Sequence, residues 1–150
     1  MIKIFNYFIQ SIIIYFLFII GRLLGISISR ILFSLIFVKI APYFKSKKVI
    51  KDNLRIFNKN LKEEEKQEII SNMWKNYGKT FIEYIFLNKL KKNNSHIKVF
   101  GEKNLQKVIN NHKPVIFVSG HFANFELMSM EIVKKKISLA TIYRPLNNFF

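Results

Sequence analysis

The sequence predicts an α/β fold: an N-terminal membrane helix, a helical segment, and then the first strands of a mainly parallel sheet. Two observations carry this prediction. Residues 4–21 contain no charged side chain, and residues 97–143 alternate between short apolar runs and helical spacing, as parallel α/β domains do. We divide the chain into a hydrophobic membrane anchor over 1–43, a basic linker and helical segment over 44–95, and a partial α/β domain over 96–150.

Composition narrows the function classes. The chain has 150 residues, with 25 Lys and Arg against 9 Asp and Glu, for a net charge of +16. Such a charge favours anionic partners such as lipid, nucleic acid or an acidic protein. The chain has no cysteine and three histidines, which excludes disulfide scaffolds, thiolate zinc sites and cysteine nucleophiles and argues against a histidine-rich metal cluster.

The uncharged stretch is long enough to cross a bilayer. As a helix, residues 4–21 would measure about 27 Å, against a hydrocarbon core of about 30 Å. A cleaved signal peptide is less consistent because no small-residue cleavage site follows and Arg22 comes directly after the stretch. A buried core helix is the other alternative. Residues 23–41 would continue along the interface or form a second hydrophobic helix.

Basic residues follow the apolar stretch, and Lys3 alone precedes it. This bias places the bulk of the chain in the cytoplasm. The cluster Lys45, Lys47, Lys48 and Lys51 would lie near anionic headgroups, although a solvated loop gives the same pattern.

A soluble helix is predicted next. Asn60 has the type and spacing of an N-cap, with Glu63 as its partner. Apolar residues then recur at helical spacing from Ile69 to Phe86, past Gly78, as a core-facing or membrane-facing stripe.

Short apolar runs predict the strands of the sheet. We expect strands at 97–100, 115–119 and 137–143, with helices over 103–110 and 122–135 between them. The sequence stops seven residues after Tyr143, and three strands form a small sheet. We therefore expect the N-terminal part of a longer protein.

One motif carries chemistry: Gly120-His121-Phe122-Ala123-Asn124-Phe125-Glu126. Imidazole titrates near neutral pH, which suits a general base. On one helix, five residues turn about 500°, so His121 and Glu126 would point apart. They meet only if His121 lies in a turn before the helix, which Gly120 permits. We then expect Nδ1 of His121 to bond Glu126, with Nε2 facing a substrate hydroxyl. A structural histidine is the alternative.

These residues resemble the late acyltransferases of bacterial lipid A biosynthesis, of the lauroyl/myristoyl transferase type. His121–Glu126 is similar to the H-x4-D/E signature of that family. Further segments resemble the family in order and spacing: Lys48–Leu54 with Phe57, Gly78–Glu83, Phe100–Leu105 and Ile142–Asn148. The resemblance covers nearly the whole chain and about the first half of a family member.

The resemblance implies acyl transfer from acyl carrier protein to a hydroxyl of an anionic lipid A precursor, at the cytoplasmic side of the bacterial inner membrane. His121 would be the base and Glu126 would orient it. Arg144, Asn124 and Asn147 would contact substrate, and no metal or other cofactor is needed. For Arg144, an ion pair with Glu126 or Glu131 is the alternative. The region 96–150 would be the acyltransferase domain.

Two other functions remain open. A glycerophospholipid acyltransferase also has a histidine followed by an acid in an H-x4-acid motif, but it usually carries Asp at the position of Glu126. An inactive membrane-anchored basic fragment would have no coupling between His121 and Glu126. The sequence has no recognisable helix-turn-helix, aromatic stacking platform or zinc module, which argues against nucleic-acid binding.

Overall fold

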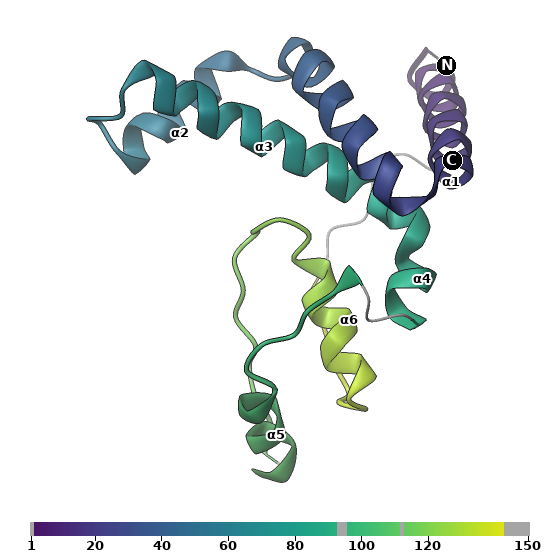
Figure 1. Ribbon diagram of the computed structural model, residues 1–150, viewed down its shortest axis with the longest axis vertical. Coiled ribbons are helices and arrows are strands. Elements are labelled where there is room, and N and C mark those ends of the chain that lie inside the picture. Colours follow the sequence, from purple (N-terminus) through teal and green to yellow (C-terminus); the bar gives the residue numbers. More distant parts are fainter. Residues whose placement is uncertain (1, 93–95, 112, 143–150) are drawn as a thin grey trace. The chain divides into compact units, whose positions relative to one another are not determined.

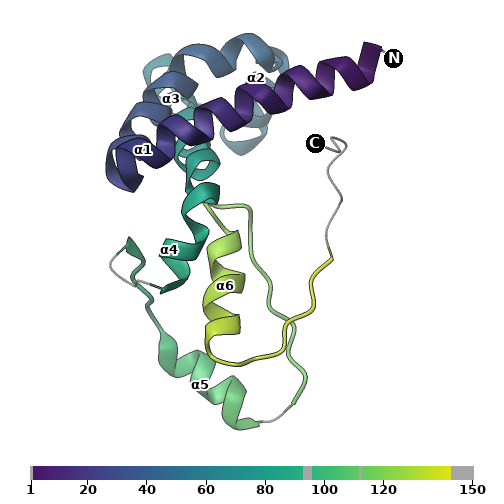
Figure 2. The same cartoon turned by 90° about the vertical axis from the view of Figure 1, so that its right-hand side faces the viewer.

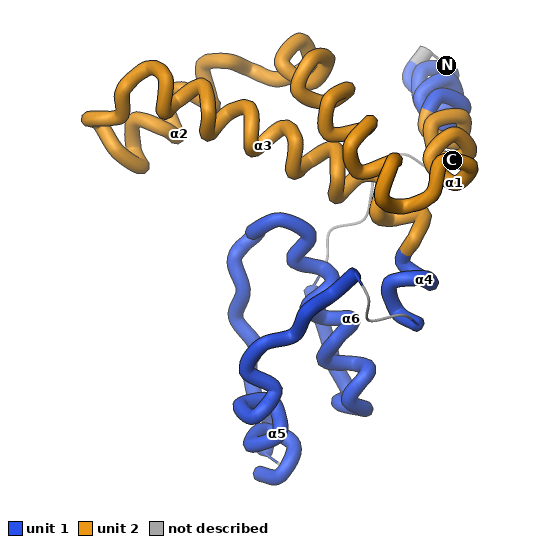
Figure 3. Tube along the Cα trace, in the orientation of Figure 1, with its two compact units in different colours: residues 1–13, 87–150 blue, residues 14–86 orange. Residues whose placement is uncertain are grey.

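Helices make up the regular structure of the part that can be described. The computed structural model describes residues 2–92, 96–111 and 113–142, and every regular element within these ranges is a helix (Figure 1). The chain divides into two compact units (Figure 3). One unit is formed by residues 14–86, and the other by residues 1–13 together with residues 87–150.

The long apolar helix α1 (Ile2–Phe44) is broken at one residue. Gly25 has φ 75° and ψ 166°, which no helix contains, and α1 changes direction there (Figure 2). The buried hydroxyl of Ser29 donates to the carbonyl oxygen of Gly21 at 2.7 Å, which closes the chain around the break. Glycine suits this position because a positive φ strains other residues. We call residues 2–24 the first arm and residues 26–44 the second arm.

By length and composition, α1 is able to cross a membrane. An 18-residue window within it has a mean hydropathy of 2.2, and many of its large apolar side chains are exposed. This agrees with the predicted apolar helix at residues 4–21 and is also what a core helix or a signal sequence can show.

The second arm packs against α3 (Glu63–Glu83) in the unit of residues 14–86. A Cβ at Gly78 of α3 would collide with the backbone carbonyl of Phe33, so the two helices approach as closely as glycine allows. The ring of Phe81 lies 5.1 Å from that of Phe18, 6.0 Å from that of Phe33 and 5.4 Å from that of Phe37. Ile82 is fully buried. Trp74, Ile82 and Phe86 of the predicted stripe therefore face the core, whereas Ile69 and Tyr77 of the same stripe are exposed.

An ion pair links the same two helices. Nε of Arg30 on the second arm donates to Oε1 of Glu83 at 2.7 Å, and the carboxylate is buried. A charge buried in this way needs a partner. The pair therefore fixes the second arm of α1 to the end of α3.

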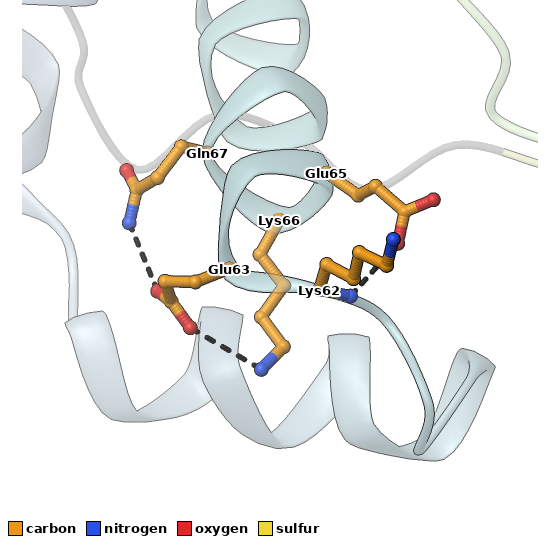
Figure 4. Close-up of polar contacts among 5 residues, drawn as sticks. All are labelled: Lys62, Glu63, Glu65, Lys66 and Gln67. Carbon is orange, nitrogen blue, oxygen red and sulfur yellow. Dashed lines mark hydrogen bonds and ion pairs between the residues drawn. The ribbon is translucent and has the colours of Figure 1, made fainter.

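The helices α2 (Lys47–Phe57) and α3 begin with side-chain caps. The Ser46 hydroxyl accepts from the backbone N–H of Val49 at 3.4 Å. At α3 the predicted cap was wrong: Lys62, not Asn60, precedes the helix, and its N–H donates to Glu65 at 2.7 Å (Figure 4). Asn60 instead donates its N–H to the side chain of Asn58 at 2.9 Å, in a turn before the helix.

The 3₁₀ turn η1 (Tyr84–Phe86) ends the unit of residues 14–86. The helices after it belong to the unit of residues 1–13 and 87–150, and they are α4 (Leu87–Lys92), α5 (Glu102–Asn111) and α6 (Glu126–Lys134). The predicted helix at 103–110 is confirmed as α5. The helix predicted over 122–135 begins later, at Glu126.

The predicted α/β fold with a parallel sheet is wrong for the described residues. The segments expected to be strands, 97–100, 115–119 and 137–142, carry no strand pairing; Tyr143 lies outside the described residues. Ile116 and Val118 are about nine-tenths exposed. An apolar run is typical of a buried strand, but a strand also needs neighbours to bond its N–H and C=O groups. Those neighbours are not encoded in the run itself.

Candidate functional site

His121 lies in a tight turn before α6, as the sequence predicted. The backbone N–H of Phe122 donates to the carbonyl oxygen of Gly120 at 2.8 Å, which places His121 at the centre of a three-residue turn. A Cβ at residue 120 would collide with the ring of Phe122. A larger residue at position 120 would therefore require the exposed ring of Phe122 to move. The imidazole is exposed instead of being locked into a core.

Glu126 is the first residue of α6, five positions beyond His121. The carboxylate is exposed, and no hydrogen bond joins it to His121 among the residues that the structure describes. The ring of His121 lies instead against that of Phe125, with centroids 4.3 Å apart and planes 59° apart. The turn therefore brings the two residues to the same end of α6, but the expected Nδ1 contact is not formed.

Sequence reasoning missed Phe125 as a neighbour of the histidine. The signal was present, because Phe125 lies four residues after His121 within the motif and both flank the start of a helix. An aromatic ring held at this distance restricts the orientations of the imidazole. Phe125 is thus the residue that positions His121 in this structure.

A groove of about 900 Å³ opens beside the turn, within the unit that contains residues 87–150. The segments that line it are the end of α5, residues 113–121, α6 and residues 135–142. Apolar side chains form much of the lining, and they include Val115, Phe117, Met128, Ile132 and Leu139. The groove therefore joins an imidazole to an apolar wall, an arrangement that can hold an alkyl chain beside a base.

Ion pairs hold α6 in its own unit. Nζ of Lys134 pairs with Glu131 at 2.5 Å and donates to the carbonyl oxygen of Leu90 of α4 at 3.3 Å. Nζ of Lys135 lies 3.0 Å from Glu102 of α5. Glu131, which was one alternative partner for Arg144, is thus already paired with Lys134.

The other predicted site residues have different outcomes. Asn124 is half-buried in the turn between His121 and Glu126. Its backbone carbonyl oxygen accepts from the backbone N–H of Leu127 at 3.2 Å. Arg144 and Asn147 lie outside the described residues. Within the ranges 2–92, 96–111 and 113–142, no group of three histidine or carboxylate side chains could hold a metal ion.

Comparison with known proteins assigns the family. The sequence profile of the bacterial lipid A biosynthesis acyltransferases matches residues 1–150. No curated protein and no solved structure matches the chain. The profile covers both the apolar α1 and the turn that carries His121, so the match does not rest on one motif. The chain therefore belongs to the bacterial lipid A biosynthesis acyltransferase family.

Proposed function

We propose that the protein transfers a fatty acyl group from the thioester of acyl carrier protein to a hydroxyl of an anionic lipid A precursor, with His121 as the general base. Family membership supports the acyl transfer and the lipid A pathway. The observation that carries the assignment of the base is the position of His121: exposed, in a tight turn, at the wall of a groove with a largely apolar lining.

The chemistry needs one base and one good leaving group. Nε2 of His121 takes the proton of the acceptor hydroxyl, and the oxygen attacks the thioester carbonyl carbon. The C–S bond then breaks, an ester forms, and the carrier thiolate takes the proton from the imidazolium. No protein nucleophile and no cofactor enters this sequence.

Glu126, Arg144, Asn124 and Asn147 have supporting roles in the proposal. A rotation of the imidazole away from Phe125 would let Nδ1 donate to the Glu126 carboxylate, which would fix the tautomer and stabilise the imidazolium. Arg144 is a planar donor suited to a phosphate, a sugar acid or the developing oxyanion. Asn124 and Asn147 would supply further polar contacts to the substrate.

Charge and hydropathy agree with the proposed partners. Acyl carrier protein is acidic and the lipid A precursor is anionic, so a protein of net charge +16 would attract both. With α1 in the inner membrane and the basic flank on the cytoplasmic side, the enzyme would meet its acceptor in the headgroup plane.

Replacement of the proposed base tests the mechanism. The assay follows radiolabelled lipid A precursor and charged acyl carrier protein in membranes that contain the protein expressed from its complete gene. We expect His121→Ala to lower kcat by at least about a hundredfold, the usual contribution of a general base. His96→Ala is the matched control, since His96 lies outside the groove lining, and should keep full activity. Equal activities of the two variants would exclude His121 as the base, and transfer to lysophosphatidic acid alone would indicate a glycerophospholipid acyltransferase.

The orienting role of Glu126 needs a separate readout, because a carboxylate at the start of a helix also stabilises that helix. We expect Glu126→Gln to lower kcat about tenfold or more, to leave KM nearly unchanged and to shift the acidic limb of the pH–rate profile. Glu131→Gln, on the same helix, is the control and should leave the profile in place. An unchanged kcat and profile in Glu126→Gln would restrict Glu126 to a structural role.

A further inference from the structure

The second arm of α1 is apolar on two opposite faces. One face carries Ile26 and Phe33, both of which are buried, and Phe33 contacts α3 at Gly78 and Phe81. The other face carries Ile28, Ile31 and Leu35, which are 57%, 64% and 53% exposed. This spacing places the three side chains on one side of the helix. We call them the outer face. A helix that is apolar all round needs an apolar environment on both sides.

A second apolar surface follows directly in the chain. Tyr43 and Phe44, which end α1, are more than three-quarters exposed, as is Ile56 of α2. Val49 and Phe57 of α2 are also exposed, whereas Leu54 is buried. We call Tyr43, Phe44, Val49, Ile56 and Phe57 the α2 edge.

Cations surround the α2 edge. Lys45, Lys47, Lys48, Lys51 and Arg55 all lie between Tyr43 and Phe57, and the only acid in that stretch is Asp52, which is 3.7 Å from Arg55. On α2 the basic side chains share one side of the helix and the apolar ones the other. Exposed aromatic residues beside lysines, on a strongly amphipathic helix, are typical of a helix that lies in a membrane interface.

We propose that the outer face and the α2 edge bind an anionic lipid bilayer in the plane of its surface, in addition to the anchoring by the first arm. The inference rests on the proposed membrane anchoring, and it adds which part of the protein lies on the lipid. Two arguments favour lipid over a protein partner. The outer face continues the apolar first arm along one helix, and the flanking charge is complementary to anionic headgroups. The unit of residues 14–86 would therefore be held against the membrane by two surfaces.

Depth measurements on single-cysteine variants test this inference. Residues 1–150 contain no cysteine, so Ile31→Cys and Ile56→Cys can each place one environment-sensitive fluorophore in this part of the chain. The protein is placed in phosphatidylcholine vesicles with or without phosphatidylglycerol. Lipid-bound nitroxides and aqueous iodide then compete to quench the label. Ile13→Cys reports on the first arm, and Asn72→Cys, on the exposed side of α3, is the aqueous control.

The expected pattern is specific to the proposal. Labels at residues 31 and 56 should be quenched by shallow lipid nitroxides and protected from iodide, whereas the label at residue 72 should show the reverse. Lys47→Gln with Lys48→Gln should lower the lipid-bound fraction of the Ile56→Cys label relative to the free fraction by about 30-fold in phosphatidylglycerol vesicles, from about fivefold per lysine. Lys103→Gln with Lys107→Gln changes the net charge equally and should have little effect.

Four outcomes would overturn the inference in distinguishable ways. Iodide access at residue 31 equal to that at residue 72 would leave the outer face in water. Protection of residue 31 from both quenchers would mean that protein covers it. Absence of lipid quenching at residue 13 would remove the membrane anchoring itself. Retention of lipid quenching at residue 13 with loss at residues 31 and 56 would overturn the in-plane surface alone.

Discussion

Glu63 shows how one side chain sets the acid stability of a helix. Its carboxylate accepts from Nε2 of Gln67 at 3.2 Å and from Nζ of Lys66 at 3.3 Å (Figure 4). These two hydrogen bonds, and then the charges of Lys66 and Lys51, lower the pKa of Glu63 below its ordinary value of 4.5. Lys51 belongs to α2, so the start of α3 and the neighbouring helix both favour the ionised carboxylate.

The lowered pKa predicts a pH dependence. Because the folded state binds this proton less tightly than the unfolded state, Glu63 contributes stability above its unfolded pKa, and that contribution is lost as the pH falls through the folded pKa. We expect Glu63→Gln to reduce the loss of stability below about pH 4.5. Unfolding in detergent micelles is followed by the fluorescence of Trp74, the only tryptophan.

Glu64→Gln is the matched control, since Glu64 lies in the same first turn and no hydrogen bond of its carboxylate is found among the described residues. An acid titration that is identical for Glu63→Gln and the natural protein would contradict the assignment to Glu63.

At the scale of elements, the buried pair Arg30–Glu83 is the polar link between the second arm and α3. The Glu83 side chain is 9% exposed and that of Arg30 is 25% exposed. Removal of Arg30 takes the ion-pair partner from the buried Glu83 carboxylate, which is more costly than removal of both side chains. A shift of one helix along the other would separate the two charges and cost free energy. The pair therefore favours one register of the two helices.

This argument predicts a double-mutant cycle. We expect Arg30→Met and Glu83→Gln each to lower the free energy of unfolding by about 3 kcal/mol, and the double variant by clearly less than the sum. Denaturant titration in micelles, again with Trp74 fluorescence, gives the three values. Strict additivity would mean that the two side chains contribute independently.

At the scale of the whole molecule, the sequence specified local structure better than long-range pairing. The apolar helix, the stripe that continues past Gly78 and the turn at His121 follow from spacing over a few residues, and all three are found. A helix bonds to itself at i and i−4, so its signal is complete within one segment. The predicted strands at 115–119 and 137–142 needed partners from elsewhere in the chain, and their apolar runs did not encode those partners.

In the candidate site, too, the local turn was predicted from the sequence and the side-chain contact was not. A turn at His121 was expected as the condition for a contact with Glu126, and the turn is found although that contact is not formed among the described residues. The contact between them depends on the rotamer of His121, and the ring of Phe125 occupies the position beside the imidazole. The break at Gly25 could not be read from the sequence either, because glycine also occurs inside helices. In the structure, the hydrogen bond from Ser29 to the Gly21 carbonyl accompanies the break at Gly25.

Under the proposed membrane anchoring, the break at Gly25 also limits how much of α1 the bilayer would accommodate. As one rod, the 43 residues of α1 would measure about 64 Å, roughly twice the hydrocarbon thickness. Residues 2–24 alone measure about 34 Å, a length that a modest tilt reconciles with the bilayer. The hydrophobic mismatch is thereby removed by one left-handed residue, and the apolar residues beyond it are released from spanning.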